Sequence, residues 1–141
     1  MGTTPLQSVP QFDSLELIKS NSTKFTFAGF SGHAGAVSNG QESTLIGTIT
    51  HNLGFVPILI LLDGLNVNGA TLSSGSVFSN GFQSNAWNSI IYEILADNNS
   101  FNIYLQNNYA AAAGGTTGNV GGFTNVPYTW YLLRQRAKAS V

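Results

Sequence analysis

The chain has 141 residues, enough for one domain of ordinary size, and only 8% of them are charged, against about 25% in typical soluble domains. A net charge of −1 excludes a basic nucleic-acid-binding surface, and the absence of cysteine excludes disulfides and thiolate metal sites. Asn, Ser, Thr and Gln together contribute 48 residues, so amides and hydroxyls rather than ions must solubilise the protein.

Residues 1–12 are predicted to form an extended arm, because two prolines disfavour helix and lack amide donors. Such an arm either stays unordered or lies along a neighbouring subunit. The residues expected to hold it there are Pro5, Leu6, Val9 and Pro10. We expect neither a secretory signal nor membrane insertion, since the start of the chain lacks a basic, then apolar, segment and the longest apolar run has eight residues.

The first predicted elements follow the arm. Residues 15–19 fit either one helical turn or a strand. They lead through 20–22 into 24–30, where alternating aromatic residues favour a strand, and the whole segment is predicted to be a hairpin. Residues 31–43 hold three glycines and no apolar periodicity, which predicts a loop.

Two strands are predicted next. Residues 44–50 alternate, so that Leu45 and Ile49 share one face. Residues 55–62 are continuously apolar, which predicts a strand covered on both faces. Pro57 places the start of that strand at an edge or a strand end.

The middle of the chain, residues 64–89, is a long polar stretch with several glycines. Within it, 77–78 and Phe82 are predicted to contribute to a short strand. Trp87 is predicted to anchor the stretch to the core.

The clearest local pattern is a hairpin over 89–106, turning at 97–100, because its second arm has a perfect period of two. Residues 107–125, rich in Asn, Ala and Gly, are predicted to be a long exposed loop. An aromatic strand follows at 128–134, and a basic tail at 135–141 is expected to be frayed and solvated.

Together these elements predict an all-β domain over residues 13–134, namely an antiparallel β-sandwich of jelly-roll-like type. An apolar, weakly charged sandwich needs its strand edges covered and has little colloidal protection alone. We therefore expect a homo-oligomer.

Sequence features of catalysis are scarce. His33 and His51 have no carboxylate at ligand spacing, so we expect an exposed or capping histidine in each case and no metal site. No nucleophile elbow, phosphate-binding loop or dinucleotide fingerprint occurs, so no cofactor is expected. A glycosidase needs two acids flanking a cleft, whereas Asp63 and Asp97 fall at strand ends, where turn acids ordinarily lie. The protein is therefore not expected to be an enzyme.

Binding of an uncharged sugar fits the composition better. Flat aromatic rings stack on sugar C–H faces, and amides hydrogen-bond to hydroxyls. The alternative interpretation is that Trp87 belongs to the core and the amides solvate loops. The candidate ligand-binding residues are Trp87, Tyr104, Asn107, Asn108, Tyr109 and Asn119.

Residues 48–60 read Thr-Ile-Thr-His-Asn-Leu-Gly-Phe-Val-Pro-Ile-Leu-Ile. This segment resembles a recurrent element of tailed-bacteriophage virion proteins, in which a strand ends in His-Asn-Leu-Gly-aromatic-Val-Pro before an apolar strand. The pattern continues more loosely with the turn at 97–99 and the aromatic strand at 128–133. Those modules are small β-sandwiches, often trimeric, on tail-fibre tips and other exposed parts of the particle.

Physical reasons favour a turn within this element. The side chains of His51 and Asn52 can bond to the backbone, and Gly54 can adopt positive φ. Leu53 and Phe55 would then hold the turn to the core. We therefore interpret a set of five residues, His51, Asn52, Leu53, Gly54 and Pro57, as structural rather than catalytic.

The resemblance implies a structural virion protein made in the host cytoplasm and displayed on the particle as a homotrimer. Its expected partners are copies of itself, other virion proteins and a host-surface glycan. One role is host recognition at a tail or fibre tip, through loops 64–89 and 107–122. The alternative is capsid decoration or a head fibre, anchored by the arm. A glycan-degrading enzyme is the least favoured reading.

Overall fold

The structure is a computed structural model that describes residues 12–35, 38–63, 71–72, 76–78, 86–111 and 115–137. Within these ranges every regular element is a β-strand, which confirms the predicted all-β class. The described residues include no helix long and apolar enough to cross a membrane. All but the last residue of the expected arm, and most of the stretch 64–89, lie outside them.

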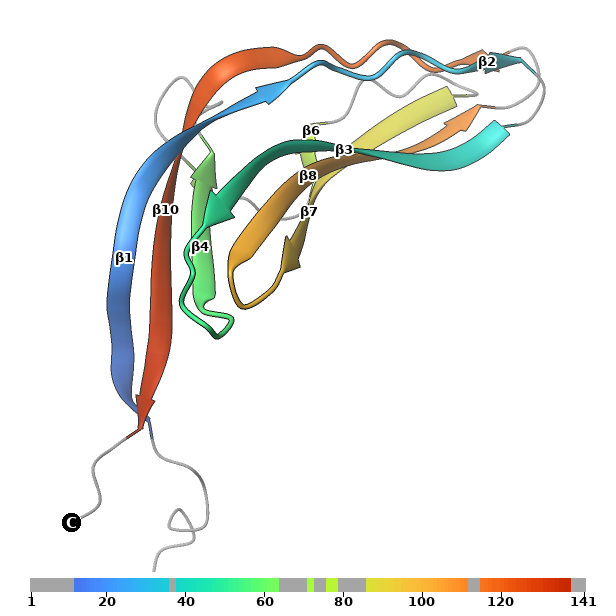
Figure 1. Ribbon diagram of the computed structural model, residues 1–141. Coiled ribbons are helices and arrows are strands. Elements are labelled where there is room, and N and C mark those ends of the chain that lie inside the picture. The colour runs from blue at the N-terminus through green and yellow to red at the C-terminus, as the bar shows by residue number, and fades with distance from the viewer. Residues whose placement is uncertain are drawn as a thin grey trace, which may run out of the picture.

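Two antiparallel sheets, each with three long strands and a short edge strand, form a sandwich-like fold (Figure 1). The first sheet has the order β1-β10-β4-β5, and its strands are β1 (Phe12–Phe27), β10 (Phe123–Ala137), β4 (Ile58–Asp63) and β5 (Thr71–Leu72). The second has the order β3-β8-β7-β6, and its strands are β3 (Ser38–Thr50), β8 (Ser100–Ala111), β7 (Ala86–Ala96) and β6 (Ser76–Phe78).

β1 and β10 form a ribbon that links the two sheets. Their pairing continues past the first sheet through the bridge between Phe30 and Val120. It ends in a further small pair, β2 (Ala34–Gly35) with β9 (Gly115–Thr116). Figure 1 shows the ribbon rising beside β4 and then bending across the β3-β8-β7 sheet toward β2. Residues 28–35 and 115–122, which continue from β1 and lead into β10, therefore lie across the second sheet.

The core lies between the sheets and is rich in aromatic residues. The Phe25 and Tyr128 rings, both fully buried, lie 4.7 Å apart between centroids. The Tyr128 hydroxyl lies 2.6 Å from the Tyr92 hydroxyl, which provides a polar partner inside an apolar core. The other large buried side chains are Phe27, Ile46, Ile49, Leu61, Ile90, Phe101, Ile103, Leu105, Trp130 and Leu132.

Two β-bulges decide which side chains reach this core. The register of β1 against β10 shifts at Ile18, and that of β3 against β8 shifts at Ile46. The alternation predicted for residues 44–50 is therefore wrong, because Leu45 is 50% exposed while Ile46 and Ile49 are both buried. One extra residue in a strand moves every later side chain to the opposite face.

Several predicted boundaries are corrected by the pairing. The expected hairpin within residues 15–30 is wrong, since β1 runs unbroken from Phe12 to Phe27. The expected loop at 31–43 is wrong from Ser38 onward, where β3 begins. The expected loop at 107–125 is wrong at both ends, because β8 extends to Ala111 and β10 begins at Phe123. In each case a partner strand supplies the backbone hydrogen bonds that the local sequence does not reveal.

The apolar run at 55–62 is not buried on both faces. β4 begins only at Ile58, whose side chain is 40% exposed, and Phe55 and Val56 before it are 36% and 52% exposed. Pro57, which is buried, precedes the strand, as predicted.

Other predicted elements are confirmed. The hairpin at 89–106 is present and is longer, since it is formed by the whole of β7 and β8. Residues 77–78 lie in β6, whereas Phe82 lies outside the described residues. The strand at 128–134 lies within β10, which continues to Ala137 and so includes the start of the expected tail.

Candidate functional site

The predicted ligand-binding residues do not share one loop. Four of them lie on β8, where alternation sends Tyr104 and Asn108 to the outer face of the sheet and Asn107 and Tyr109 to the inner face. Asn119 lies on the ribbon, where its side-chain oxygen accepts a hydrogen bond of 2.7 Å from the backbone N–H of Gly32. The backbone of Trp87 belongs to β7, but its side chain lies outside the described residues.

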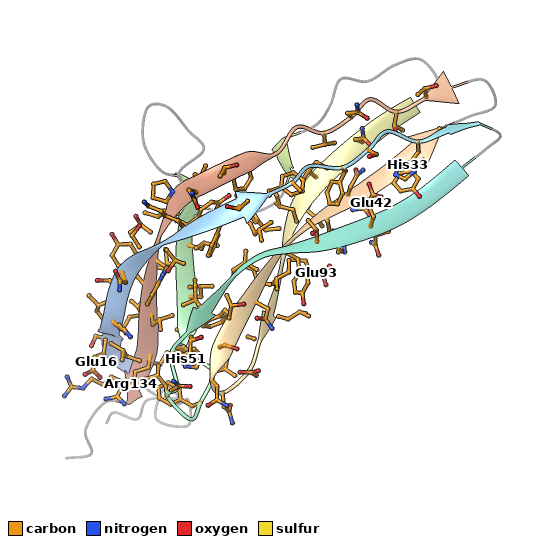
Figure 2. The ribbon with its side chains drawn as sticks, turned by 45° about the horizontal axis from the view of Figure 1, so that its top comes forward. Glu16, His33, Glu42, His51, Glu93 and Arg134 are labelled. Carbon is orange, nitrogen blue, oxygen red and sulfur yellow. The ribbon has the colours of Figure 1, made fainter. Side chains whose placement is uncertain are left out.

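The inner face carries a polar cluster that the sequence analysis did not predict. His33 Nε2 lies 3.0 Å from Glu42 Oε2 (Figure 2), so the carboxylate contact that sequence spacing seemed to exclude is made through the fold. Asn107 is fully buried, and its Nδ2 donates to Glu42 Oε1 at 3.1 Å and to Asn88 Oδ1 at 3.0 Å. Asn88 in turn donates to the Gly118 carbonyl at 2.8 Å. The cluster therefore joins the ribbon to the second sheet.

A histidine beside a carboxylate can act as a general base. Here, however, both partners are already engaged. The His33 ring stacks on Tyr109 with centroids 3.7 Å apart, and Glu42 also accepts from Asn107. No hydroxyl is hydrogen-bonded to the His33 ring among the described residues. The geometry therefore suits a structural contact between the ribbon and the second sheet rather than catalysis. The buried Asn107 Oδ1 has no hydrogen-bond partner in the described part of the chain, so the stability of this contact should be sensitive to substitution of Asn107.

The outer face of the second sheet holds a second polar group of residues, which we call the outer polar face: Gln41, Glu93, Asn102, Tyr104, Gln106 and Asn108. Gln41 Nε2 donates to Gln106 Oε1 at 3.1 Å and to Asn108 Oδ1 at 2.9 Å. Gln106 in turn donates to Glu93 Oε2. The four hydrogen-bonded side chains, Gln41, Gln106, Asn108 and Glu93, come from the three long strands and fix one another's positions.

The first sheet presents a different surface, which we call the apolar base. Leu17 pairs with Leu133 on β10, and Leu133 pairs with Ile58 on β4, so the three side chains form one row across the sheet. Leu17 is 55% exposed and Ile58 is 40% exposed. Leu15, two residues along β1, is also 55% exposed. Large apolar side chains are thus grouped on an outward face, which in soluble proteins marks a contact surface.

The turn predicted at 51–54 is present. His51 Nδ1 accepts a hydrogen bond of 3.1 Å from the Leu53 N–H, and φ is 54° at Asn52 and 80° at Gly54. Leu53 packs against the core, whereas Phe55, expected to do the same, is 36% exposed. The N–H groups of His51 and Asn52 both donate to the carbonyl of Asn99. The turn is therefore fastened to the β7–β8 turn.

Asp97 shapes that second turn. Its Oδ1 accepts hydrogen bonds of 2.7 Å from the backbone N–H groups of Asn99 and Ser100. These bonds, that from Asn99 first, hold the pKa of the Asp97 carboxyl below its ordinary value of 3.8. Because the folded pKa is depressed, the stabilisation is present above pH 3.8 and is lost as the pH falls through the lowered pKa.

We therefore predict that Asp97→Asn reduces the loss of stability on acidification. The neutral amide keeps an acceptor oxygen but does not titrate, so the variant should lose less melting temperature than the wild type between about pH 4 and pH 2. Thermal unfolding followed by circular dichroism over this range measures the difference. Parallel curves for the two proteins would contradict the assignment.

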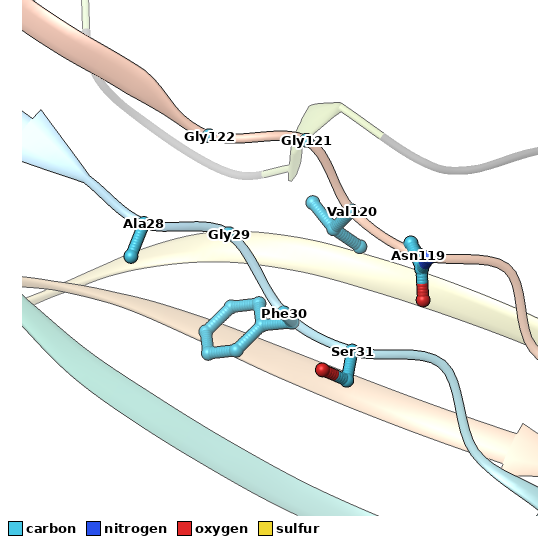
Figure 3. Close-up of a pocket in the computed structure, with 8 residues that line it drawn as sticks. All are labelled: Ala28, Gly29, Phe30, Ser31, Asn119, Val120, Gly121 and Gly122. Atoms are coloured by element: carbon cyan, nitrogen blue, oxygen red, sulfur yellow. The ribbon is translucent and has the colours of Figure 1, made fainter.

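A shallow hollow lies on the ribbon between β1 and β2 (Figure 3). It is lined by residues 28–31 on one segment and 119–122 on the other. No titratable side chain faces it in this set, so it offers no group for catalysis. The described residues also contain no cluster of three or more metal-binding side chains.

Comparison with protein-family models, with curated proteins and with solved structures finds no match to this chain. The site must therefore be interpreted from its own geometry.

Proposed function

We propose that the chain is a structural component of a tailed-phage virion, a jelly-roll-like sandwich that assembles as a homotrimer on an exposed part of the particle and contributes to host-surface glycan recognition. Two observations support the proposal. The sequence of residues 48–60 resembles the virion element, and the apolar base provides a surface for assembly. The resemblance is the basis for proposing a virion location and a trimer, and the apolar base is the basis for proposing assembly.

The exposed row Leu17–Leu133–Ile58 is the observation on which assembly rests. Fully burying one such side chain contributes about 1.5–3 kcal/mol relative to leaving it in water. Several of them on one face outweigh the weak electrostatics of a chain with 8% charged residues. Association of identical faces around a symmetry axis removes these side chains from water on every copy at once.

Anchoring to a capsid by the arm is the second candidate role. β1 begins at Phe12, two residues before Ser14 and close in sequence to Leu15 and Leu17 of the apolar base. An arm that continues from this strand starts beside the proposed interface, which is where an anchoring segment would be useful. Deletion of residues 1–11 should abolish particle association and leave the oligomer intact if decoration is the role.

We predict that Leu17→Glu shifts the protein toward monomer. A carboxylate in the centre of the apolar row would have to be desolvated on assembly, so the association should weaken by at least about tenfold, equivalent to 1.4 kcal/mol. Sedimentation velocity across a micromolar concentration series measures the change.

Ser22→Glu is the matched control, because it introduces the same charge on the same strand and the same outward face, at an exposed position that pairs with Thr129, two rows along the sheet from the row Leu17–Leu133–Ile58. It should sediment like the wild type. A wild-type protein that is monomeric at micromolar concentration would contradict the proposed assembly, and an image of the particle without a labelled copy of this subunit would contradict the virion role.

A further inference from the structure

We infer that the outer polar face of the β3-β8-β7 sheet binds a neutral oligosaccharide, with one sugar ring stacked on Tyr104. This inference rests on the proposed host-recognition role and gives it a surface, which is the outer face of the sheet rather than a loop. The ligand class follows from the chemistry of the side chains, their fixed positions and their low charge.

Tyr104 stands at the centre of this face. Its strand neighbours in register are Leu45 on β3 and Glu93 on β7, so an apolar side chain lies on one side of the ring and a carboxylate on the other. Leu45 is 50% exposed, and Tyr104 is half-buried. The Tyr104 ring stacks on no other ring, and its hydroxyl makes no hydrogen bond, among the described residues. A ring flanked by an exposed leucine offers the apolar contact that a sugar C–H face requires.

Hydrogen-bonding groups surround this contact and are already ordered. Gln41, Gln106 and Asn108 hold one another through the bonds given above, and Asn108 also donates to Gln106 at 3.3 Å. Asn102 accepts from Thr48 at 2.8 Å, which fixes its amide as well. A ligand that meets such groups does not need to order them, and this lowers the entropic cost of binding.

Several polar atoms of these ordered side chains have no hydrogen-bond partner among the described residues. Asn102 Nδ2 remains as a donor, and Gln41 Oε1 and Glu93 Oε1 remain as acceptors, since none of these atoms is bonded within the described part of the chain. Unpaired donors and acceptors on an outer sheet face match the hydroxyl groups of a sugar, each of which both donates and accepts.

Charge selects the class of sugar. Glu93 is the single ionisable acid of the outer polar face, and no lysine or arginine belongs to it. An acidic or sulfated glycan would meet a carboxylate with no compensating cation, so it should be rejected. A second copy of the chain is less suited to this face than to the apolar base, because association would remove water from the hydrogen-bonded side chains of Gln41, Gln106 and Glu93.

A single stacked ring with a few hydrogen bonds gives weak binding. In a homotrimer three such faces act together, so a polymer that reaches two of them is held more tightly than one that reaches a single face. The inference therefore predicts weak binding of short oligosaccharides and stronger binding of long neutral polysaccharides.

The test uses the full-length oligomeric protein on an array of unsubstituted glucans, galactans and mannans, with uronic-acid and sulfated polymers beside them. Binding of one or more neutral polymers and rejection of the acidic ones is expected. Tyr104→Ala should weaken the binding by about tenfold or more, and Tyr104→Phe, which keeps the ring, should stay within about threefold of wild type. Lys24→Ala, on the first sheet, is the unchanged control.

Gln106→Leu provides a second variant in case Tyr104→Ala fails to fold, and melting temperature and oligomeric state are measured for every protein. It should weaken binding because Gln106 organises both Gln41 and Asn108. Three outcomes would overturn the inference: neutral binding that survives both variants, binding restricted to acidic polymers, or no glycan binding by an intact oligomer. The last of these leaves the structural virion role standing, whereas a monomeric protein contradicts the proposed function itself.

Discussion

Replacing Asn107 with aspartate is expected to lower the free energy of unfolding by about 3–5 kcal/mol, the cost typical of an uncompensated charge inside a protein. The side chain is fully buried, and its Nδ2 is the donor to both Glu42 and Asn88. Aspartate removes that donor and places a second carboxylate about one hydrogen-bond length from Glu42. Two carboxylates at this separation repel each other strongly where water cannot screen them.

Asn108→Asp is the matched control, since the same substitution is made one residue further along β8. Its side chain lies on the outer face of the sheet, where water can solvate a charge, so the change should stay within about 0.5 kcal/mol. Urea denaturation of the two variants and the wild type measures both values. Equal destabilisation by the two substitutions would show that the polar cluster does not depend on the inner-face position.

This contrast shows what local sequence could predict and what it could not. The hairpin of β7 and β8 was predictable up to Gln106, because apolar residues recur there with period two. From Asn107 onward the core face of the strand becomes polar, and the same alternation continues with Asn107 and Tyr109 pointing inward. A strand that buries an amide has the composition of a loop, so the pattern could not be recognised.

The polar cluster was beyond prediction for a further reason. His33 and Glu42 are nine residues apart, and Asn107 is far from both in the sequence. Their contact depends on the ribbon lying over the second sheet, which is a long-range pairing. The residue types gave one indication, because His, Glu and Asn side chains are costly to bury without polar partners. Without the strand order, however, the sequence offered no means of joining them.

The β-bulges set a similar limit on the surfaces. Before Ile18, alternate residues of β1 place Leu15 and Leu17 on the outer face, and after it they place Phe25 and Phe27 in the core. The two sets have the same periodicity, so a count of apolar residues assigns all of them to one face. Only the register against β10 shows which of these residues belong to the core, where they stabilise the subunit, and which belong to the apolar base, where they are proposed to drive assembly.

A second large effect is expected where the segment after β1 passes close to the segment before β10. There Gly122 passes so close to the opposite strand that a Cβ atom would overlap the carbonyl oxygen of Phe27 and lie 2.7 Å from the carbonyl carbon of Ala28. Figure 3 shows the two strands running side by side at this point. The obstructing atoms are backbone, so no rotamer change relieves the overlap and the strands must separate. We predict that Gly122→Ala destabilises the protein by about 1–3 kcal/mol.

Gly121→Ala tests the same prediction with the opposite sign. A Cβ atom at Gly121 would have no neighbour within 4 Å, and the residue does not adopt positive φ. Alanine there reduces the conformational freedom of the unfolded chain and should leave stability unchanged or raise it by about 0.4–1 kcal/mol. Chemical denaturation of the pair separates the two effects, because adjacent glycines differ only in what their missing side chains would contact. If both variants unfold at the same denaturant concentration, the close approach of the two strands is not what requires glycine at position 122. If Gly122→Ala alone is destabilised, the crossing of the ribbon over the second sheet depends on that contact, and with it the placement of His33 against Glu42.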